Sequence, residues 1–276
     1  MAKIIEVNDI FAPELEIYTK LTDRALLCKQ HPEDAVFVAE SPLVIDLAMK
    51  SGCVPLHFLM EPRHIDGTAK EILSHCPPDI PVYTATEEKL KEITGFYLTR
   101  GVLCTLKRPQ IPSAEELCRN AKRVAVLENV MNPENIGAIF RSAAALHMDA
   151  VLLTAEGSDP LTRRASRVSM GTVFQVPWGY LPTDRPWQDS LHQMGFSTAA
   201  MVLRDDTLDI RDPRFGEIEK LAIVLGNEGY GLIDSTIDQC DYAVKIPMSH
   251  GVDSLNVAAA AAIAFFQLGL GTTFDK

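Results

Sequence analysis

The sequence lacks the features that would place it in a membrane, outside the cell or around a metal ion. Its six cysteines form no CxxC pair and no secretory segment precedes them, so we expect reduced thiols and a cytoplasmic protein. The longest apolar run, Leu255 to Leu270, contains Asn256 and Gln267 and falls short of the roughly 20 residues that a membrane-spanning helix needs. The seven histidines have no metal-ligand spacing. We therefore expect no membrane contact and no metal.

Positive charge is also scarce, which bears on whether the chain binds nucleic acid. Lysine and arginine number 26 against 37 aspartates and glutamates, and the net charge is −11. Such a chain does not attract a polyanion over its whole surface, although a local basic site can still bind one. One candidate is the cluster of Arg163, Arg164 and Arg167. Taken alone, this cluster is more typical of a solvated helix face whose arginines pair with nearby carboxylates.

The apolar pattern divides the chain into two α/β domains. Over residues 1–107 short apolar strands alternate with helical stretches, and Ser41 followed by Pro42 is suited to begin one of these helices. Residues 108–117 contain two prolines and no apolar periodicity, which predicts a linker. Residues 118–276 contain runs rich in Val, Ile and Leu, typical of a parallel sheet covered on both faces. In this second domain we predict strands at residues 123–130, 150–154, 196–203, 220–226 and 242–248, and helices at residues 135–147, 161–169, 186–194 and 255–268.

Three segments of the second domain contain a predicted strand end followed by a turn and a helix. They are ENVMNPENIGAIFRSAAAL (residues 128–146), LGNEGYGL (residues 225–232) and IPMSHGVDSLNVAAAAAIAFF (residues 246–266). Because parallel sheets bind ligands beyond the carboxyl ends of their strands, the three loops can converge on one site. The glycines of the second segment are spaced as GxxGxG rather than GxGxxG, which makes a dinucleotide-binding fold a weak alternative.

Each segment carries polar residues that have both a structural and a functional interpretation. In the first, Arg141 falls in a helix of largely apolar residues, so it needs a partner, either a structural carboxylate or an anionic ligand at the cleft. In the second, Gly226 and Gly229 let the backbone approach a ligand or turn sharply, and Glu228 suits a helix N-terminus. In the third, Ser254 can cap a helix with a polar first turn.

In order and spacing, these three segments resemble the signature motifs of the SpoU family of RNA ribose 2′-O-methyltransferases, in the SPOUT superfamily. The resemblance covers about residues 123–276, and residues 1–107 resemble the ribosomal-protein-like substrate-binding domain that often precedes that catalytic domain. It implies an α/β fold whose C-terminal parallel sheet contains a trefoil knot, preceded by a small α/β RNA-binding domain. It also implies a homodimer through the C-terminal domain, with S-adenosylmethionine held by the knotted loops.

The resemblance further implies three sets of site residues. The expected catalytic set is Arg141, Asn135, Glu228, Ser254 and Asn256. The expected cofactor-binding set, acting mainly through backbone, is Met201, Val202, Leu203, Gly226, Asn227, Gly229, Ile246, Met248, Leu255 and Asn256. The expected RNA-binding set is Arg141, Arg163, Arg164, Arg167 and Ser169, because the arginine cluster precedes SMGTVFQVPW, which resembles the RNA-facing segment of the family.

The arginine that matches Arg141 is proposed in the family to help deprotonate the ribose hydroxyl. Arginine has a pKa above about 12, so it is a poor base at neutral pH. Positioning the RNA phosphate and stabilising the developing alkoxide is the more cautious role.

The expected function is therefore S-adenosylmethionine-dependent 2′-O-methylation of structured RNA, and the two-domain layout favours ribosomal RNA over transfer RNA. One alternative is a catalytically silent RNA-binding relative, although every signature residue is present here. Another is a methyltransferase or nucleotide-binding enzyme that acts on a substrate other than RNA. That alternative fits the acidic charge but leaves the arginine cluster unexplained.

Overall fold

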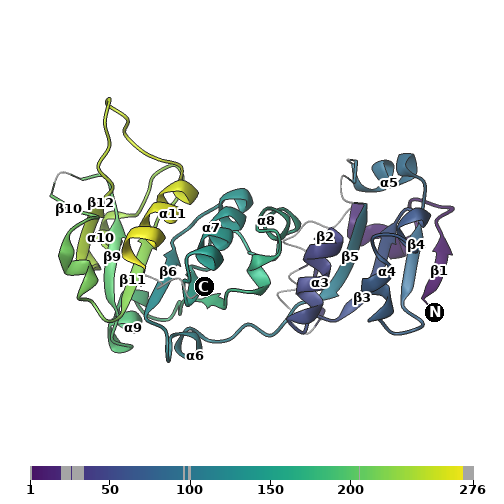
Figure 1. Cartoon of the computed structure of the whole chain (residues 1–276), viewed down its shortest axis with the longest axis horizontal. Helices are drawn as coiled ribbons and strands as arrows, with labels where there is room; N and C mark the ends of the chain where they lie inside the picture. The colour runs from purple at the N-terminus through teal and green to yellow at the C-terminus, as the bar shows by residue number, and fades with distance from the viewer. Residues whose placement is uncertain are drawn as a thin grey trace, which may run out of the picture. The chain divides into compact units, whose positions relative to one another are not determined.

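The computed structural model describes residues 2–19, 26, 34–95, 97–98, 101–204 and 206–269 (Figure 1). The chain divides into an N-terminal unit, residues 1–110 together with 161–174, and a C-terminal unit, residues 111–160 together with 175–276. The predicted division between two domains therefore lies close to the observed one. The segment 161–174 is the exception, because we assigned it to the second domain and it belongs with the N-terminal unit.

The N-terminal unit is a five-stranded sheet with short helices. Its strands lie in the order β1 (Lys3–Glu6), β4 (Pro81–Thr84), β3 (Pro55–Met60), β5 (Val102–Lys107) and β2 (Val36–Glu40). Strand β5 runs antiparallel to both of its neighbours, and the other pairs are parallel. The helices are α1 (Glu16–Thr19), α3 (Pro42–Lys50), α4 (Lys70–Ser74), α5 (Glu87–Thr94) and, from later in the chain, α8 (Arg163–Val168), which contacts β2. Helix α3 begins as predicted, with Ser41 as its cap and Pro42 as its first residue.

The predicted linker at residues 108–117 is wrong in its second half. Helix α6 (Ala114–Cys118) begins there, and Ser113 and Glu116 form a reciprocal capping box at its start. Cys118 is buried in the core of the C-terminal unit. The two prolines indicated a loop, but the Ser-Ala-Glu-Glu sequence that follows them is typical of the start of a helix.

The C-terminal unit contains a seven-stranded parallel sheet, which confirms the predicted α/β fold class. The strand order is β10 (Leu208–Asp209), β12 (Tyr242–Lys245), β9 (Ser197–Met201), β11 (Leu221–Leu225), β6 (Arg123–Leu127), β7 (Ala150–Leu153) and β8 (Trp178–Tyr180), and all neighbours are parallel. Strands β8 and β10 were not predicted, because runs of three and two residues show no pattern in a sequence. The other five strands were predicted.

The remaining helices of this unit are α7 (Pro133–Ala145), α9 (Trp187–Gln193), α10 (Asp234–Gln239) and α11 (Val257–Leu268). Helices α7 and α11 lie side by side, and α11 also contacts the central strand β11 (Figure 1). Helix α10 was not predicted. The trefoil knot stays a prediction. Among the described residues, no helix has both the length and the apolar character that crossing a membrane would require.

A buried arginine fixes the end of α11 to the sheet. Arg123, the first residue of β6, donates from Nε to the Leu268 carbonyl at 2.8 Å and from Nη1 and Nη2 to the Glu219 and Ile218 carbonyls, both at 2.9 Å. Burial lowers the pKa of the Arg123 guanidinium, and the nearby carboxylate of Asp149 acts against that shift. Three segments of the unit are thereby joined by charge-assisted hydrogen bonds.

Candidate functional site

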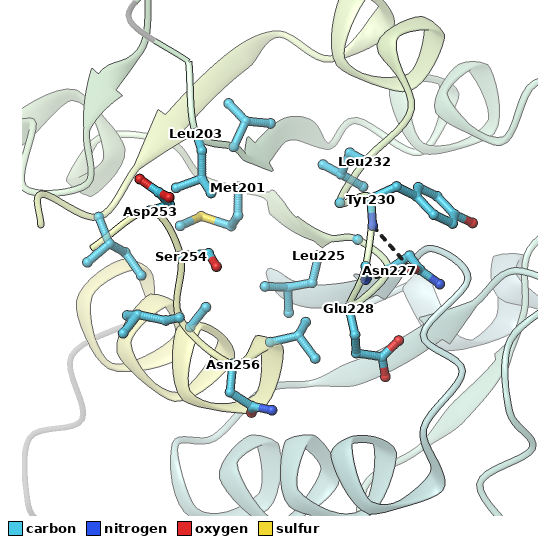
Figure 2. A pocket seen from close by; sticks show the side chains of 18 of the residues that line it. Met201, Leu203, Leu225, Asn227, Glu228, Tyr230, Leu232, Asp253, Ser254 and Asn256 are labelled. Carbon is cyan, nitrogen blue, oxygen red and sulfur yellow. Dashed lines mark hydrogen bonds between the residues drawn. The ribbon is translucent and has the colours of Figure 1, made fainter. Parts of the chain in front are cut away.

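A cavity of about 970 Å³ lies beyond the carboxyl ends of β9, β11 and β12 (Figure 2). Three loops line it, at residues 201–204, 225–232 and 246–256, and the start of α7 adds Met131, Asn132 and Asn135. All three segments predicted to converge, residues 128–146, 225–232 and 246–266, therefore contribute to the cavity, and the loop at residues 201–204 joins them. The walls are mixed, because apolar side chains such as Met201, Leu203 and Leu225 alternate with polar groups such as Glu228 and Asn256.

The structure brings most of the predicted site residues to this cavity. The predicted cofactor-binding residues that line it are Met201, Val202, Leu203, Gly226, Asn227, Gly229, Ile246, Met248, Leu255 and Asn256. The predicted catalytic residues that line it are Asn135, Glu228, Ser254 and Asn256. Arg141 and the arginine cluster do not line it. What each lining residue binds stays a prediction.

Glu228 joins the loop after β11 to the start of α7. Its carboxylate accepts hydrogen bonds from the backbone N–H groups of Met131 at 3.0 Å and Asn132 at 2.9 Å, and from Nδ2 of Asn135 at 2.9 Å. Partial burial raises the pKa of Glu228, but the hydrogen bonds from Asn135, Met131 and Asn132 outweigh burial, and the net pKa lies below the ordinary value for glutamate. The carboxylate is therefore ionised at neutral pH.

The side-chain amide of Asn135 also connects Glu228 to the start of α11. Asn135 Oδ1 accepts a hydrogen bond from Asn256 Nδ2 at 3.0 Å, and Asn256 Oδ1 accepts one from the Ala258 N–H at 2.9 Å. Asn256 is thus the residue that caps α11, so the predicted cap by Ser254 is wrong. Ser254 lines the cavity two residues earlier.

The helix start at α7 also differs from the prediction. Asn132 is the cap, since its Oδ1 accepts a hydrogen bond from the Glu134 N–H at 2.8 Å, and Pro133 is the first helical residue. Asn135 consequently lies in the first turn, where it is buried and faces Glu228. An asparagine immediately before a proline was the signal for this cap.

Two glycines of the 225–232 loop, Gly226 and Gly231, are needed for the backbone conformation of the loop. A Cβ added to Gly226 would lie 2.4 Å from the backbone of residues 231 and 232, so only glycine fits there. The residue with positive φ is Gly231, at 72°, whereas a Cβ on Gly229 would meet only the Asn227 side chain at 3.4 Å. Gly229 therefore does not take the positive φ considered for it, and close approach of a ligand there stays a prediction.

Asn227 acts through its side chain as well as its backbone. Its Oδ1 accepts hydrogen bonds from the N–H groups of Gly229 at 2.8 Å and Tyr230 at 3.4 Å, and its Nδ2 donates to the Asn129 carbonyl at 2.8 Å. The cofactor contact expected of its backbone stays a prediction. The side chain ties the turn at residues 227–231 to the loop after β6.

Arg141 does not lie where the sequence predicted. The buried side of α7 is formed by Ile136, Ile139, Phe140 and Ala143, and the Arg141 side chain is exposed. Within the described ranges, no hydrogen bond or ion pair to another residue holds its guanidinium. Of the two alternatives for Arg141, the structural salt bridge is therefore absent there, and the guanidinium is available to a group outside this chain.

The arginine cluster is held in the N-terminal unit by a buried carboxylate. Arg163 Nη1 lies 3.6 Å from Glu40 Oε2 and Arg167 Nη1 lies 3.3 Å from Glu40 Oε1, while the Glu40 side chain is 1% exposed. Arg164 belongs to the same helix, α8. For Arg163 and Arg167, the structure supports pairing with a carboxylate over the predicted phosphate contact. The signal that the prediction missed is a glutamate at the end of the apolar strand VFVAE.

Ser169 follows the last residue of α8 and is its cap. It is buried, its Oγ donates to the Ser166 carbonyl at 2.8 Å, and the same Oγ accepts from the Gly171 N–H at 3.1 Å. These contacts close the end of α8, and the predicted RNA contact of Ser169 stays a prediction. In the part of the chain that the structure describes, no group of three or more His, Cys, Asp or Glu residues could hold a metal ion.

Comparison with known proteins adds to this geometry. Residues 122–266 match the model of the SpoU rRNA methylase family. A tRNA/rRNA methyltransferase of Mycobacterium bovis, itself uncharacterised, is 37% identical over 235 residues, which is 84% of this chain and 80% of that protein. An AdoMet-bound rRNA methyltransferase from Sinorhizobium meliloti superposes with a TM-score of 0.76 at 22% identity, covering 96% of this chain and 97% of that one. A crystal structure of an RNA 2′-O ribose methyltransferase superposes with a TM-score of 0.72 at 21% identity, covering 97% and 98% of the two chains. At these identities the solved structures show the fold alone.

Proposed function

This chain belongs to the SpoU rRNA methylase family, and from that premise we propose that it transfers the methyl group of S-adenosylmethionine to a ribose 2′-hydroxyl of RNA. Membership makes it an RNA methyltransferase. The 2′-oxygen as the methyl acceptor and ribosomal RNA as the substrate are the finer parts of the proposal. We expect it to act in the cytoplasm, where such RNA is found.

The observation that carries the proposal is the convergence of the three motif loops on one cavity. Its volume of about 970 Å³ is at the upper end of the range for small-molecule sites. Apolar side chains such as Leu225, Ile246 and Leu255 suit an adenosine and a methionine side chain, and backbone groups of the tight turns suit their polar atoms. When bound, S-adenosylmethionine supplies an electrophilic methyl group.

Glu228 has the properties of a positioning residue rather than a base. Its lowered pKa makes it a weak proton acceptor, and three hydrogen bonds already occupy most of its lone pairs. Its carboxylate instead orients the Asn135 amide, which in turn orients Asn256. We propose that these two amides hold the ribose or its phosphate while the 2′-oxygen attacks the methyl carbon.

We propose that Arg141 acts in the cavity of a second copy of the chain. Helix α11 exposes Ile263 and Phe266, which are 40% and 77% exposed, and α7 next to it exposes Arg141. Pairing two copies through this apolar surface would bury both side chains, and burial of such area favours association. In the homodimer Arg141 would contact the RNA phosphate and stabilise the developing alkoxide.

Mass mapping of ribose methylation tests the proposed function. Ribosomal and transfer RNA from a strain without the gene are incubated with the purified protein and labelled S-adenosylmethionine, then digested and analysed by mass spectrometry. We expect one new 2′-O-methylnucleoside in ribosomal RNA. A methylated base would contradict the ribose assignment, and label found only in transfer RNA would contradict the substrate. If titration detected no binding of S-adenosylmethionine, the result would favour the alternative of a catalytically silent RNA-binding relative.

A further inference from the structure

Two large side chains are exposed at the rim of the cavity next to Glu228. Tyr230 is 61% exposed and Met131 is 53% exposed, and both line the cavity. Figure 2 shows the Tyr230 ring pointing away from the centre of the cavity, on the side of the turn that carries Asn227 and Glu228. The exposed aromatic ring leaves hydrophobic surface in contact with water, so covering it with a partner would make the free energy of binding more favourable.

A chain of hydrogen bonds reaches the Tyr230 hydroxyl from the loops after β6 and β7. Thr154 Oγ1 donates to Asn129 Oδ1 at 2.8 Å, which turns Asn129 Nδ2 toward the Tyr230 hydroxyl at 3.4 Å. Asn129 itself has a φ of 52°, and its N–H donates to Thr154 Oγ1 at 2.9 Å. The turn beneath the ring is closed by the paired hydrogen bonds of Asn227 and Gly231, at 3.0 and 2.9 Å. The closed turn therefore anchors the ring at its backbone, and one long hydrogen bond from Asn129 adds to this at its hydroxyl.

An anchored, exposed ring suits stacking on a flat partner. An aromatic side chain that is held in place loses little conformational entropy when a nucleobase stacks on it. Proteins recognise unpaired RNA bases in this way, with phenylalanine, tyrosine, tryptophan or histidine as the platform. Tyr230 stands two residues from Glu228, whose hydrogen bonds orient Asn135 and Asn256.

We propose that Tyr230 is a stacking platform for an unpaired nucleobase of the RNA substrate, next to the ribose that is methylated. This proposal rests on the proposed function, since it concerns the RNA side of the same site. Stacking on Tyr230 turns the nucleotide out of its helix and holds its ribose at the cavity mouth. The residue thereby makes the enzyme select unstacked nucleotides over paired ones.

Steady-state kinetics on RNA test the platform with three variants. Tyr230→Ala should lower kcat/KM for RNA about 5- to 150-fold, mainly through a higher KM, because each stacked base loses that much affinity on removal of its ring. Tyr230→Phe keeps the ring and should stay within about 3-fold of the wild type. Ile233→Ala removes exposed apolar surface just after this loop, at the cap of α10, without removing a ring, and should also act like the wild type. Wild-type kinetics for Tyr230→Ala, or equal losses for Tyr230→Phe and Tyr230→Ala, would overturn the platform.

Two further measurements separate the platform from other roles of the ring. Titration of Tyr230→Ala with S-adenosylmethionine should give the wild-type Kd within about 2-fold; a larger loss would mean that the ring contacts the cofactor and would overturn the proposal. Size-exclusion chromatography should give the wild-type oligomeric state; a change would make Tyr230 an interface residue and overturn the proposal as well.

Fluorescence decides the proposal independently of methyl transfer. In Tyr230→Trp, adding oligoadenylate or oligouridylate of twelve nucleotides should quench the new tryptophan, and heparin, a polyanion without bases, should not. No quenching, or equal quenching by heparin, would overturn the platform. If the wild type methylated no RNA, the proposed function would fail while this quenching would still support or overturn base stacking.

Discussion

Two glutamates that stand at the ends of strands meet very different partners. Glu40, the last residue of β2, is buried and pairs with Arg163 and Arg167. Glu228, just beyond β11, faces the cavity and accepts hydrogen bonds only from neutral N–H groups among the donors described above. The charge of Glu40 is therefore compensated by two guanidinium groups, whereas the charge of Glu228 is met only by neutral hydrogen-bond donors among those named here.

This difference separates a structural role from a functional one. Two guanidinium groups compensate the charge of Glu40, and the three side chains join α8 to β2 within the N-terminal unit. The charge of Glu228 is spread over backbone and amide N–H groups, and its three hydrogen bonds set the geometry of two loops at the cavity. Residue type alone does not distinguish the two glutamates; their partners do.

The largest effect is expected from Arg141, for which the described residues show no ion pair of the kind that Glu40 forms. Arg141→Ala should lower the rate of methyl transfer about 10²- to 10³-fold, as removal of one transition-state donor does in other enzymes. The Kd for S-adenosylmethionine, measured by calorimetry, should stay unchanged. Arg167→Ala is the matched control, because its guanidinium pairs with Glu40 and its loss should leave methyl transfer within about 3-fold. Full activity of Arg141→Ala would remove the residue from the mechanism.

A smaller effect on rate is expected at Glu228. In Glu228→Gln the side-chain NH2 would face at least one of the three N–H donors, so Asn135 and Asn256 lose their orientation. Methyl transfer should fall about 10- to 100-fold in a single-turnover assay. Glu134→Gln, an exposed neighbour that does not line the cavity, should keep the wild-type rate. Equal rates for the two variants would place Glu228 with Glu40 as a structural residue.

Glu40 should affect stability and leave catalysis unchanged. Glu40→Gln leaves two guanidinium groups without their counter-charge, but both arginines are partly exposed, so the cost is about 1–3 kcal/mol of unfolding free energy rather than the full cost of a buried pair. Urea unfolding measures this loss. A double-mutant cycle with Arg167→Ala should give a coupling energy of about 1 kcal/mol. Slower methyl transfer at saturating substrate would contradict the structural role.

The smallest effect concerns pH. Because the pKa of Glu228 is lowered in the folded chain, its hydrogen bonds stabilise the fold fully above the ordinary pKa of 4.5, and that contribution is lost as pH falls through the lower folded value. The difference between the unfolding free energies of the wild type and Glu228→Gln should therefore shrink below about pH 4.5. The change in this difference should be less than about 1 kcal/mol, because the group is largely solvated. Taking the difference between the two proteins cancels the other titrating groups. A difference that stayed constant from pH 7 to pH 3 would contradict the lowered pKa.

Local sequence signals predicted the parts of this protein that depend on neighbours in the chain. The cap at Ser41 and the five longer strands of the second sheet were predicted, because caps and apolar runs span only a few residues. The convergence of the three loops was predicted as well, since parallel strands present their carboxyl ends at one edge. The capping box at Ser113 was missed although its signal is equally local.

The outward direction of Arg141 was not predicted, and the reason is geometric. The buried side of α7 is chosen by the elements packed against it, among them α11, which lies more than a hundred residues later in the chain. Apolar residues occupy most positions of α7, so the pattern left the exposed side of the helix undefined. A single arginine in such a helix therefore says little about its own burial.

The sequence by itself determined the fold class and the loops that form the cavity, because periodicity and strand ends are properties of consecutive residues. Only the tertiary structure decided which polar groups meet. Glu40 pairs with Arg167, which is 127 residues away in the sequence, and Glu228 accepts a hydrogen bond from Asn135, which is 93 residues away. Asn129, oriented by Thr154, donates to Tyr230, which is 101 residues away. Hydrogen bonds and ion pairs act over a few ångströms in space, and no pattern of neighbouring residues records which distant groups the folded chain will bring within that distance.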